Sequence, residues 1–584
     1  MLKLKFVVFV LALTCSLFGS VNNIEHETKK NIKLLLDTNY EFLLINKFNL
    51  IDYYSANSYK PLWTDNNGIK NIGLDLLEKI KNDPVYKPNS SKIFRLNEVI
   101  STVNSLNKSD INYSQNLARV DLMLTELFDR YATYISNGSA KWNIFEEKLV
   151  EQEKEKEIKA HWDKFSLNKN PKILLKKVIS TNDLNSVLKE IDFNYPNAEK
   201  LIAAMSELEK IASNGGYIKI PEFKPLKIGD VSDVLPIVRK RLLQSNDLTA
   251  NCQNGNSNQN LVLNNNYPPE EIEVFEKLKK NCENIFDEDL KNAVVSFQKK
   301  HGLNSEGILG IQTQRFLNIP VERKISIIRL NLERMRWLPR DLGEKYLLVN
   351  IPEYRLRMYE HNDIKLNMAV IVGDVKFPTP IFSDKMSYVV LNPSWNIPGS
   401  IAKNEIIPKL LKDPKYLQTK GIDIYAGWNG AAPTEKVDSK EVLDSAILQN
   451  VDNLTNFRFS QTSNKENPLG KMKFMFPNKH SVYIHDTPVK HLFGQVRRAF
   501  SHGCIRLSKP DELLSTIASE DKNLNIDKAH EILANEAISE RTISLEKKIP
   551  IHIVYLTSWV DENDVLQFRE DIYNFDKMQK ELLF

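Results

Sequence analysis

Hydrophobic residues recur at helical spacing through the first third of the chain. The period of three and four positions is clear from Ile32 to Leu50 and again from Leu117 to Ile135, and it predicts amphipathic helices that pack on one another. Three tryptophans of this region are most simply core residues: Trp63, Trp142 and Trp162. No recognisable chemical motif occurs here, so we predict a helical scaffold domain over residues 22–225.

A second helical region follows a proline-bounded linker at residues 221–225. Apolar residues share one face in each of two predicted helices: Val234, Val238 and Leu242 in the first, and Leu290, Ala293, Val294 and Phe297 in the second. An Asn-rich stretch at residues 251–266 has the composition of a loop, and a third helix opens at residues 307–313. The pattern predicts a three-helix domain over residues 226–320 and a helical connector over residues 321–345.

From about Tyr346 the period changes to that of β-strands. Short runs rich in Val, Ile and Tyr predict six strands, at residues 346–351, 354–359, 367–372, 387–391, 481–485 and 551–556. A polar stretch of helical character at about residues 400–463 interrupts them, and long insertions in compact domains are often lids or binding loops. We therefore predict an α+β multidomain protein in which a β-rich domain (residues 346–558) carries a helical capping insertion. Residues 559–584 form a C-terminal segment.

Length and charge narrow the class of protein. A chain of 584 residues is too long for one core, and its 42% hydrophobic and 26% charged residues are ordinary for a soluble globular protein. Lys and Arg exceed Asp and Glu by only 79 − 75 = +4, and no basic stripe with interleaved aromatic residues occurs. This pattern argues against nucleic acid as a partner.

The N-terminus has the pattern of a secretory signal. Lys3 and Lys5 precede an apolar stretch from Phe6 to Gly19, which is shorter than the ~20 residues that span a bilayer. We predict a signal peptide at residues 1–20 and an exported chain. Because Phe18 fits the cleavage site poorly, an uncleaved inner-membrane anchor is the alternative, and it is the only membrane contact that we expect.

Export changes how the four cysteines are interpreted. Cys15 lies inside the predicted signal, and its neighbours fit a lipidation motif poorly. In an oxidising compartment Cys252 and Cys282 form either a disulfide across the Asn-rich stretch or two unpaired surface thiols. Cys504 is then left unpaired, and catalysis is one explanation for a free thiol in an exported protein.

Cys504 and His485 form the most informative chemical pattern. Cys504 follows Gly503 in the run Ser501 to Leu507, 504 − 485 = 19 positions after His485. A thiol reacts as the thiolate and has a pKa of roughly 8.5, so an imidazole that accepts its proton activates it. A glycine beside the nucleophile lets backbone N–H groups approach an oxyanion. The pattern predicts cysteine acyl transfer, with His485 as base and the N–H groups of Gly503 and Cys504 at the oxyanion.

Residues 226–320 resemble the small three-helix peptidoglycan-binding domain. The resemblance rests on the turn at Gly229-Asp230, on Phe297-Gln298 and His301-Gly302-Leu303, and on the turn from Gly307 to Thr313. It implies that peptidoglycan is a partner. A packing domain without a ligand is the alternative, because fold does not determine function.

The β-rich domain resembles the L,D-transpeptidase catalytic domain, known as the YkuD fold. The matching motifs are Ser501 to Leu507, His485-Asp486-Thr487-Pro488 and the spacing between them, with Pro393 to Pro398, Asn467 to Gly470 and Phe476 to Asn478. With the two N-terminal regions, the arrangement is similar to the large YcbB-type periplasmic L,D-transpeptidases. The resemblance implies a periplasmic enzyme with Cys504 as nucleophile, His485 as base, the backbone of Asp486 as the group that orients the imidazole, and Gly503 at the oxyanion.

The same resemblance implies a reaction. Cys504 attacks the carbonyl of the third residue of a tetrapeptide stem and expels the terminal D-alanine. An amine from another stem then takes the acyl group and forms a 3→3 cross-link. Neither step requires a metal or an organic cofactor. Peptidoglycan stems and glycan are the expected partners, with other cell-wall synthesis proteins as further candidates.

Further residues are candidates for contact with the stem peptide. Arg506 and Arg498 are suited to bind carboxylates, with a structural salt bridge as the alternative that we favour for Arg498. His502 has three interpretations: a second base, a polar group of the pocket, or a buried histidine with satisfied hydrogen bonds. The other candidates are Ser501 in the same motif and three aromatic residues for which core packing is the alternative: Trp395, Tyr388 and Trp428. His480 and His491 are expected at the surface.

Three other functions remain open. If water takes the acyl group, the protein is an L,D-carboxypeptidase that trims stems. If the catalytic domain is inactive, the protein is a peptidoglycan-binding scaffold. A zinc site built from His485, His491, His502 and Cys504 has suitable ligand types, but the spacing lacks a familiar closed-site pattern.

Overall fold

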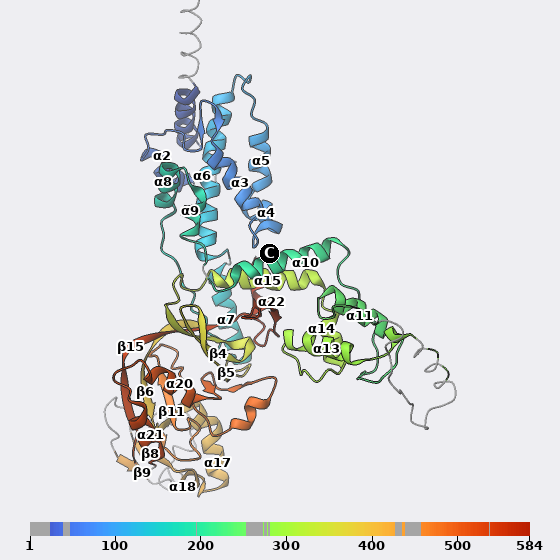
Figure 1. Ribbon diagram of the computed structural model, residues 1–584. Coiled ribbons are helices and arrows are strands. Elements are labelled where there is room, and N and C mark those ends of the chain that lie inside the picture. Colours follow the sequence, from blue (N-terminus) through green and yellow to red (C-terminus); the bar gives the residue numbers. More distant parts are fainter. Residues whose placement is uncertain are drawn as a thin grey trace, which may run out of the picture.

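The computed structural model describes residues 24–38, 47–139, 141–193, 195–250, 252, 273, 277, 281–426, 435–437, 457–535 and 538–583. The predicted signal peptide, most of the Asn-rich stretch and Trp428 lie outside these residues. Within the described ranges, no helix combines the length and the apolar composition that crossing a bilayer requires. The molecule is elongated, with helices at one end, the β-rich domain at the other and a smaller helical domain projecting sideways (Figure 1).

The N-terminal region is helical, as predicted. Residues 24–37 are helical, and the helices that follow are α2 (Lys47–Ser55), α3 (Asn71–Lys81), α4 (Ser90–Phe94), α5 (Leu96–Asn104), α6 (Tyr113–Asn137), α7 (Trp142–Lys156), α8 (Pro171–Thr181), α9 (Leu184–Lys189) and α10 (Ala198–Ser213). Long α6 is the centre of this core, because Leu117, Leu124 and Phe128 are fully buried. Its buried Asp121 accepts hydrogen bonds from the backbone N–H groups of Leu62, Trp63 and Thr64, which satisfies the carboxylate.

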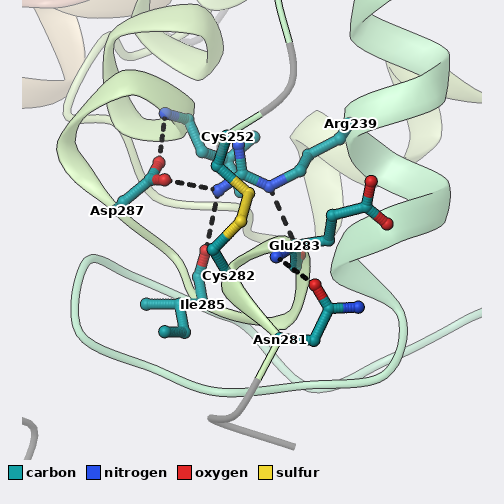
Figure 2. The surroundings of a disulfide bond; sticks show 8 residues. Arg239, Cys252, Asn281, Cys282, Glu283, Ile285 and Asp287 are labelled. Atoms are coloured by element: carbon teal, nitrogen blue, oxygen red, sulfur yellow. Dashed lines mark hydrogen bonds and ion pairs between the residues drawn. A yellow bond between two sulfur atoms is a disulfide. The ribbon is translucent and has the colours of Figure 1, made fainter. Parts of the chain in front are cut away.

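In the described part of the chain, the sideways domain contains the helices α11 (Leu235–Gln244), α13 (Glu288–Lys300) and α14 (Ile311–Leu317). The apolar faces predicted from the sequence pack together, with Leu242, Leu290 and Phe297 at 0% exposure. A disulfide joins Cys252 to Cys282, which confirms that interpretation of the cysteines (Figure 2). The bridge lies beside buried Arg239, whose guanidinium pairs with Asp287 at 2.8 Å.

The connector is helix α15 (Val321–Met335), and it belongs to the scaffold core as much as to the chain that follows. It lies along α10 across the middle of the molecule (Figure 1). Its apolar face joins Leu348 of the β-rich domain and Val560 of the C-terminal segment in one hydrophobic cluster. The C-terminal segment adds β16 (Ser558–Val560), β17 (Leu566–Phe568) and α22 (Phe575–Leu583), and α22 packs on α7 and α15.

The β-rich domain is built on one nine-stranded sheet in the order β13-β5-β14-β12-β11-β6-β15-β3-β4. The strands are β3 (Lys345–Asn350), β4 (Arg355–Glu360), β5 (Asp363–Gly373), β6 (Phe382–Leu391), β11 (Met472–Met475), β12 (Ile484–His485), β13 (Ala499–Ser501), β14 (Ile505–Leu507) and β15 (Arg541–Val554). Helices α20 (Pro510–Ala518) and α21 (Ile526–Ala534) pack against it. All six predicted strand segments contribute to this sheet.

The insertion contains strands as well as the predicted helices. It contains α16 (Gly399–Ile401), a π-helical turn η4 (Ala402–Ile406), α17 (Ile407–Lys412) and α18 (Tyr416–Lys420), as the pattern predicted. It also contains β8 (Ile422–Ala426), β9 (Glu435–Val437) and β10 (Phe457–Gln461), which form a four-stranded sheet with β7 (Trp395–Ile397). These strands are short and lie in polar surroundings, so their period is hard to see in the sequence. A separate core, with Leu410 and Phe459 at its centre, stabilises the insertion.

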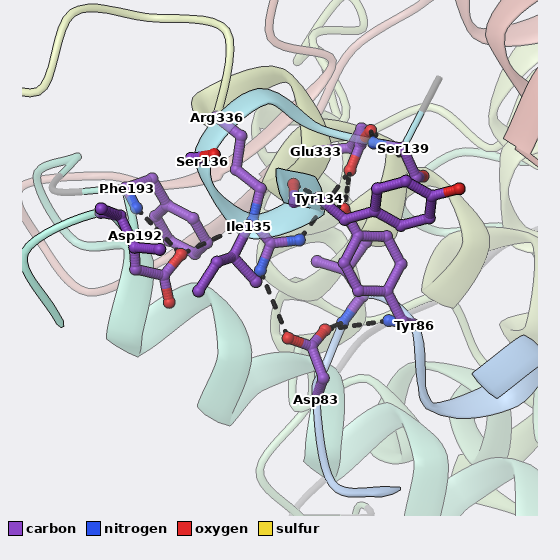
Figure 3. A network of polar contacts seen from close by, with 12 residues as sticks. Asp83, Tyr86, Tyr134, Ile135, Ser136, Ser139, Asp192, Phe193, Glu333 and Arg336 are labelled. Carbon is purple, nitrogen blue, oxygen red and sulfur yellow. Dashed lines mark hydrogen bonds and ion pairs between the residues drawn. The ribbon is translucent and has the colours of Figure 1, made fainter. Parts of the chain in front are cut away.

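A buried polar network joins the scaffold to the connector (Figure 3). Arg336, 1% exposed, follows α15 and lies 3.4 Å from Asp83 and 3.8 Å from Glu333, both buried, and 3.5 Å from Asp192. Tyr86 donates a hydrogen bond to Glu333 at 3.0 Å. Because these charges are removed from water, each depends on its partners, and the network holds the two regions in one arrangement.

We expect Arg336→Met to lower the free energy of unfolding by about 3 kcal/mol, because it leaves two buried carboxylates without their shared cation. Chemical denaturation followed by circular dichroism measures the change. Lys81→Met is the matched control, since its partner Glu78 is 3.9 Å away and both side chains are mostly exposed. A loss for Arg336→Met no larger than that of the control would show that the network contributes little.

Candidate active site

The site is built where two short strands run side by side. Strand β12 pairs in parallel with β14, so that Ile484 is opposite Ile505 and His485 is opposite Arg506. The N–H of Ile505 donates to the carbonyl of Tyr483 at 3.1 Å, which continues the pairing by one residue. Cys504 immediately precedes β14, and it therefore enters the same small region of the sheet as the residues of β12.

Residues 501–504, here called the nucleophile loop, carry the candidate nucleophile Cys504. Hydrogen bonds within the loop and from Thr379 hold its conformation. Ser501 donates to the carbonyl of Cys504 at 2.5 Å and accepts from the N–H of Gly503 at 3.2 Å. Thr379 donates to the carbonyl of Gly503 at 2.8 Å. Gly503 has φ +111°, a conformation that residues with a side chain rarely adopt. The loop needs this glycine for its backbone, and the Gly503 N–H is engaged by Ser501.

The C-terminal segment supports this loop from a distance. The hydroxyl of Tyr573 donates to the carbonyl of Gly373 at 2.6 Å and accepts from the N–H of Thr379 at 3.2 Å. The N–H of Gly373 in turn donates to the Thr379 hydroxyl at 2.8 Å. Tyr573 is buried. The last residues of the chain therefore position Thr379 under the nucleophile loop, which no local pattern in the sequence indicated.

Cys504 is surrounded by groups with opposing effects on its thiol. Burial raises the pKa of the thiol, while hydrogen bonds from the backbone and the hydroxyl of Tyr483 lower it, as does the charge of Arg506. Burial is the largest effect, so the resting thiol keeps its proton. Cys504 is the one free cysteine of the described chain, and part of its surface is exposed.

His485 is a neutral imidazole with a defined tautomer. Its side chain is buried, and Nδ1 lies 2.5 Å from the carbonyl oxygen of Asp486, so Nδ1–H donates and Nε2 is left to accept a proton. Burial lowers the pKa of His485 to about 3, and nearby Arg506 adds to this effect. The backbone of Asp486 is the group to which the sequence analysis assigned this orienting role.

The carboxylate of Asp486 is held by other groups. It accepts from the N–H of Lys471 at 2.9 Å and forms an ion pair with Lys490. A Cβ at Gly470, where φ is +62°, would collide with this carboxylate. The Asn467 to Gly470 motif therefore leaves room for Asp486, whose backbone carbonyl in turn meets the imidazole.

His485, the candidate base, lies on β12, and Cys504, the candidate nucleophile, immediately precedes the adjacent strand β14, with Tyr483 beside both. Within the described residues no hydrogen bond joins the His485 ring to the Cys504 sulfur; the ring of Tyr483 lies 5.6 Å from that of His485, and its hydroxyl contacts the thiol. Active-site hydrogen bonds are often longer before substrate binds. Sequence reasoning missed Tyr483, although its position two residues before His485 puts both on one strand face.

The two arginines occupy different environments. Arg506 is largely buried beside Cys504, and burial lowers its pKa while the thiol raises it. Its Nε has no hydrogen-bond partner, and no carboxylate of the described chain lies within ion-pair distance. Arg498 instead donates to the carbonyls of Val370, Gln495 and Tyr354. The salt bridge that we favoured for Arg498 is therefore wrong among the described residues: its role is structural, but its partners are backbone carbonyl groups.

His502 points to the capping insertion. Its Nε2 lies 3.0 Å from a carboxylate oxygen of Glu405, and both side chains are about 40% exposed (41% and 40%). Its ring lies 4.8 Å from that of Phe377. Of the three interpretations of His502, a buried histidine is wrong, and the contact with Glu405 favours a polar group at the mouth of the site.

The other candidates lie in less direct positions. Ser501 is buried within the nucleophile loop, Trp395 packs against the core of the insertion, and half-buried Tyr388 lies on β6 opposite Met475 and Ser544. The expectation that His480 is a surface residue is wrong, because its side chain is 7% exposed and meets Asp163 at 2.9 Å. Asp163 is 317 residues away in the chain, so the pairing had no local signal. His491 is exposed, as expected.

A cavity of about 940 Å³ lies away from Cys504 and His485. It is bounded by Pro196 and Lys200 of the scaffold, Tyr346 and Tyr359 of the sheet edge, and Trp559 of the C-terminal segment, and neither Cys504 nor His485 lines it. The candidate active site is therefore identified by the thiol and imidazole of Cys504 and His485, and this cavity is not part of it. In the part of the chain that the structure describes, no group of three or more His, Cys, Asp or Glu side chains is arranged to hold a metal ion.

Comparison with known families assigns the domains. Residues 344–526 match the L,D-transpeptidase catalytic domain (YkuD), residues 49–205 match the Scaffold domain, and residues 276–317 match the family described as "Putative peptidoglycan binding domain". Cys504 and His485 thus lie within the part of the chain that matches the L,D-transpeptidase catalytic domain. The chain combines that domain with a scaffold and a peptidoglycan-binding domain.

The individual proteins to which this chain is similar share less than a third of its residues over the matched regions. A Haemophilus influenzae protein named "Putative L,D-transpeptidase" is 29% identical over 262 residues, which cover 44% of this chain and 50% of that protein. The match thus spans half the length of this relative. A solved L,D-transpeptidase from Mycobacterium smegmatis is 15% identical, with 36% of this chain and 58% of that chain covered and a TM-score of 0.17. One from Xylanimonas cellulosilytica is 11% identical, with 57% of this chain and 99% of that chain covered and a TM-score of 0.16. Both are too dissimilar to extend the assignment.

We expect alkylation of Cys504 to show no thiolate plateau at neutral pH, because burial raises the pKa of the thiol above its usual value. The rate with iodoacetamide, followed by intact mass from about pH 6 to about pH 10, should still be rising near pH 9. Cys504→Ala is the control, since the other described cysteines form a disulfide. A plateau below about pH 7 would instead indicate a preformed thiolate–imidazolium pair.

Proposed function

We propose that this protein is a periplasmic L,D-transpeptidase that forms 3→3 peptidoglycan cross-links through an acyl-enzyme on Cys504. The observation that carries the proposal is that Cys504 lies directly before β14, the strand that pairs in parallel with β12 and its His485, with the imidazole tautomer set by the carbonyl of Asp486. This arrangement leaves Nε2 of His485 available for the thiol proton. The catalytic domain family supports the reaction class.

In the donor half-reaction the thiol and the imidazole both start neutral. The pKa of Cys504 is raised and that of His485 is lowered to about 3, so proton transfer accompanies attack rather than preceding it. The sulfur attacks the carbonyl of the third stem residue, and the proton moves to His485 Nε2. Because Ser501 engages the Gly503 N–H, we assign the oxyanion to the Cys504 N–H. The imidazolium then protonates the departing D-alanine amine.

In the acceptor half-reaction an amine from a second stem attacks the thioester. The new C–N bond forms as the C–S bond breaks, and the sulfur recovers a proton. If water attacks instead, the product is a shortened monomer, and the protein acts as an L,D-carboxypeptidase. Neither route requires a metal or an organic cofactor.

Arg506 is the residue that we assign to a carboxylate of the donor stem. Its guanidinium is buried beside the thiol, and its Nε is without a partner among the described residues. A buried cation without a carboxylate is costly, and an anionic ligand offsets that cost. The same charge stabilises the developing thiolate.

The other domains suit a substrate that is attached to the cell wall. The peptidoglycan-binding domain supports peptidoglycan as a partner, and the disulfide of Cys252 with Cys282 suits an oxidising compartment. We therefore propose export to the periplasm, with the N-terminal segment as signal or anchor. Other cell-wall synthesis proteins are proposed partners of the scaffold.

Purified protein incubated with tetrapeptide muropeptides should yield D-alanine and cross-linked dimers, separated by liquid chromatography and identified by mass. We expect Cys504→Ala to reduce both products by at least about a thousandfold, because the substitution removes the sulfur that attacks the stem carbonyl. Its binding to isolated sacculi should be unchanged. Tripeptide monomers without dimers would identify a carboxypeptidase, and retained activity in Cys504→Ala would contradict the mechanism.

We expect Arg506→Gln to raise the KM for the tetrapeptide donor by about tenfold, because one charge-assisted contact with the stem is lost. Arg506→Lys keeps the charge and should recover part of the loss. Initial rates of D-alanine release against donor concentration measure both variants. An unchanged KM in Arg506→Gln would show that this guanidinium does not bind the donor.

A further inference from the structure

One carboxylate of the capping insertion reaches the nucleophile loop. Glu405 meets His502 at 3.0 Å, and His502 lies two residues before Cys504. The Glu405 side chain is 40% exposed, so the carboxylate is accessible to a ligand as well as to the histidine. Its other ionic neighbour, Lys409, is 4.0 Å away on the same helical segment. The two residues of the contact are 502 − 405 = 97 positions apart.

The backbone presents Glu405 in an unusual turn. Ala402–Ile406 is π-helical, and Pro408 follows at the start of α17. Pro408 has no N–H to donate to the carbonyl four residues earlier and its ring crowds that carbonyl, which accounts for the widened turn. Ala402 and Ile406 anchor the turn in the core of the insertion. Single π turns inside helices occur frequently at functional sites.

Among the described residues, the other charged groups that we find around the nucleophile loop are cationic or already engaged. Arg506 lies beside the thiol, and Lys473 and Lys490 are close enough to lower the pKa of His485. The carboxylate of Asp486 is taken by Lys490 and a backbone N–H. The carboxylate of Asp374 accepts from the N–H groups of Lys376 and Phe377.

These surroundings suit the two substrates differently. The cationic groups around Cys504 attract the carboxylates of the donor stem. They repel the acceptor stem, because its amine is protonated to an ammonium group in water at neutral pH. Asp486 is paired with Lys490 and Asp374 accepts two backbone N–H groups, whereas the carboxylate of Glu405 is 40% exposed and contacts His502 and, at 4.0 Å, Lys409. Glu405 therefore has the charge and the exposure that an ammonium group requires.

We propose that Glu405 binds the ammonium group of the acceptor stem and thereby favours cross-linking over hydrolysis. This inference rests on the proposed transpeptidase function. The ammonium gives one proton to the Glu405 carboxylate, which passes it to solvent, and the free amine attacks the thioester. The C–N bond forms, the C–S bond breaks, and the second amine proton returns through His485 to the sulfur.

The test separates the two half-reactions. Glu405→Gln keeps the shape and can still accept a hydrogen bond from His502, but it removes the charge. We expect D-alanine release without acceptor to stay within about twofold of the wild type, while the KM of an amine-bearing acceptor stem rises about tenfold. The ratio of dimer to hydrolysed monomer, measured by mass, should fall accordingly.

Two controls make the outcome specific. Hydroxylamine is a nucleophile that is uncharged at neutral pH, so Glu405→Gln should form the hydroxamate at the wild-type rate. Glu466→Gln changes an exposed glutamate that pairs with Lys420 of the insertion and does not contact His502, and it should leave both half-reactions unchanged.

Three results would overturn the inference. The acceptor KM could be unchanged in Glu405→Gln, the loss could be equal with hydroxylamine and with the acceptor stem, or D-alanine release could fall as far as transfer does. The last two would assign Glu405 to positioning the insertion. Absence of D-alanine release in the wild type would refute the proposed function instead, so the two failures are distinguishable.

Discussion

The candidate active site depends on the parallel pairing of two very short strands. Because His485 is opposite Arg506, the register places Tyr483, His485, Cys504 and Arg506 in one small region of the sheet. A slip by one residue would turn every side chain of β12 to the opposite face. The register is held by buried Ile484 and Ile505, and by the neighbouring strands β11 and β5. Hydrophobic packing in the centre of the sheet thus determines where the polar residues lie.

Desolvation then sets the electrostatics of that region. Burial is the largest influence on the pKa of the thiol and on the pKa of the imidazole, and it favours the neutral form of each. The hydroxyl and N–H of Tyr483 and the charge of Arg506 oppose it at the sulfur. A site of this kind keeps its nucleophile protonated until a substrate arrives, and it stabilises the anion only where charge develops.

The rest of the molecule positions this region through long-range contacts. The connector α15 shares one hydrophobic core with the scaffold and with the edge of the catalytic sheet, and Arg336 adds a buried network at the same junction. Tyr573, near the end of the chain, supports Thr379 and so the carbonyl of Gly503. The insertion has a core of its own, which allows it to present Glu405 to the nucleophile loop as a preformed unit.

The sequence alone was enough to predict the helical and β-rich regions, to single out Cys504 and His485 as the candidate catalytic pair, and to name the cysteines available for a disulfide. Period, motif and composition are local properties, and they survive without coordinates. Other features became visible in the folded chain alone. Tyr483 contacts the thiol of Cys504, His502 meets Glu405, and His480 meets Asp163. Short strands also complete the insertion. Those contacts, and the neutral state of the buried pair, arise from burial and from segments distant in the chain, which no local pattern encodes.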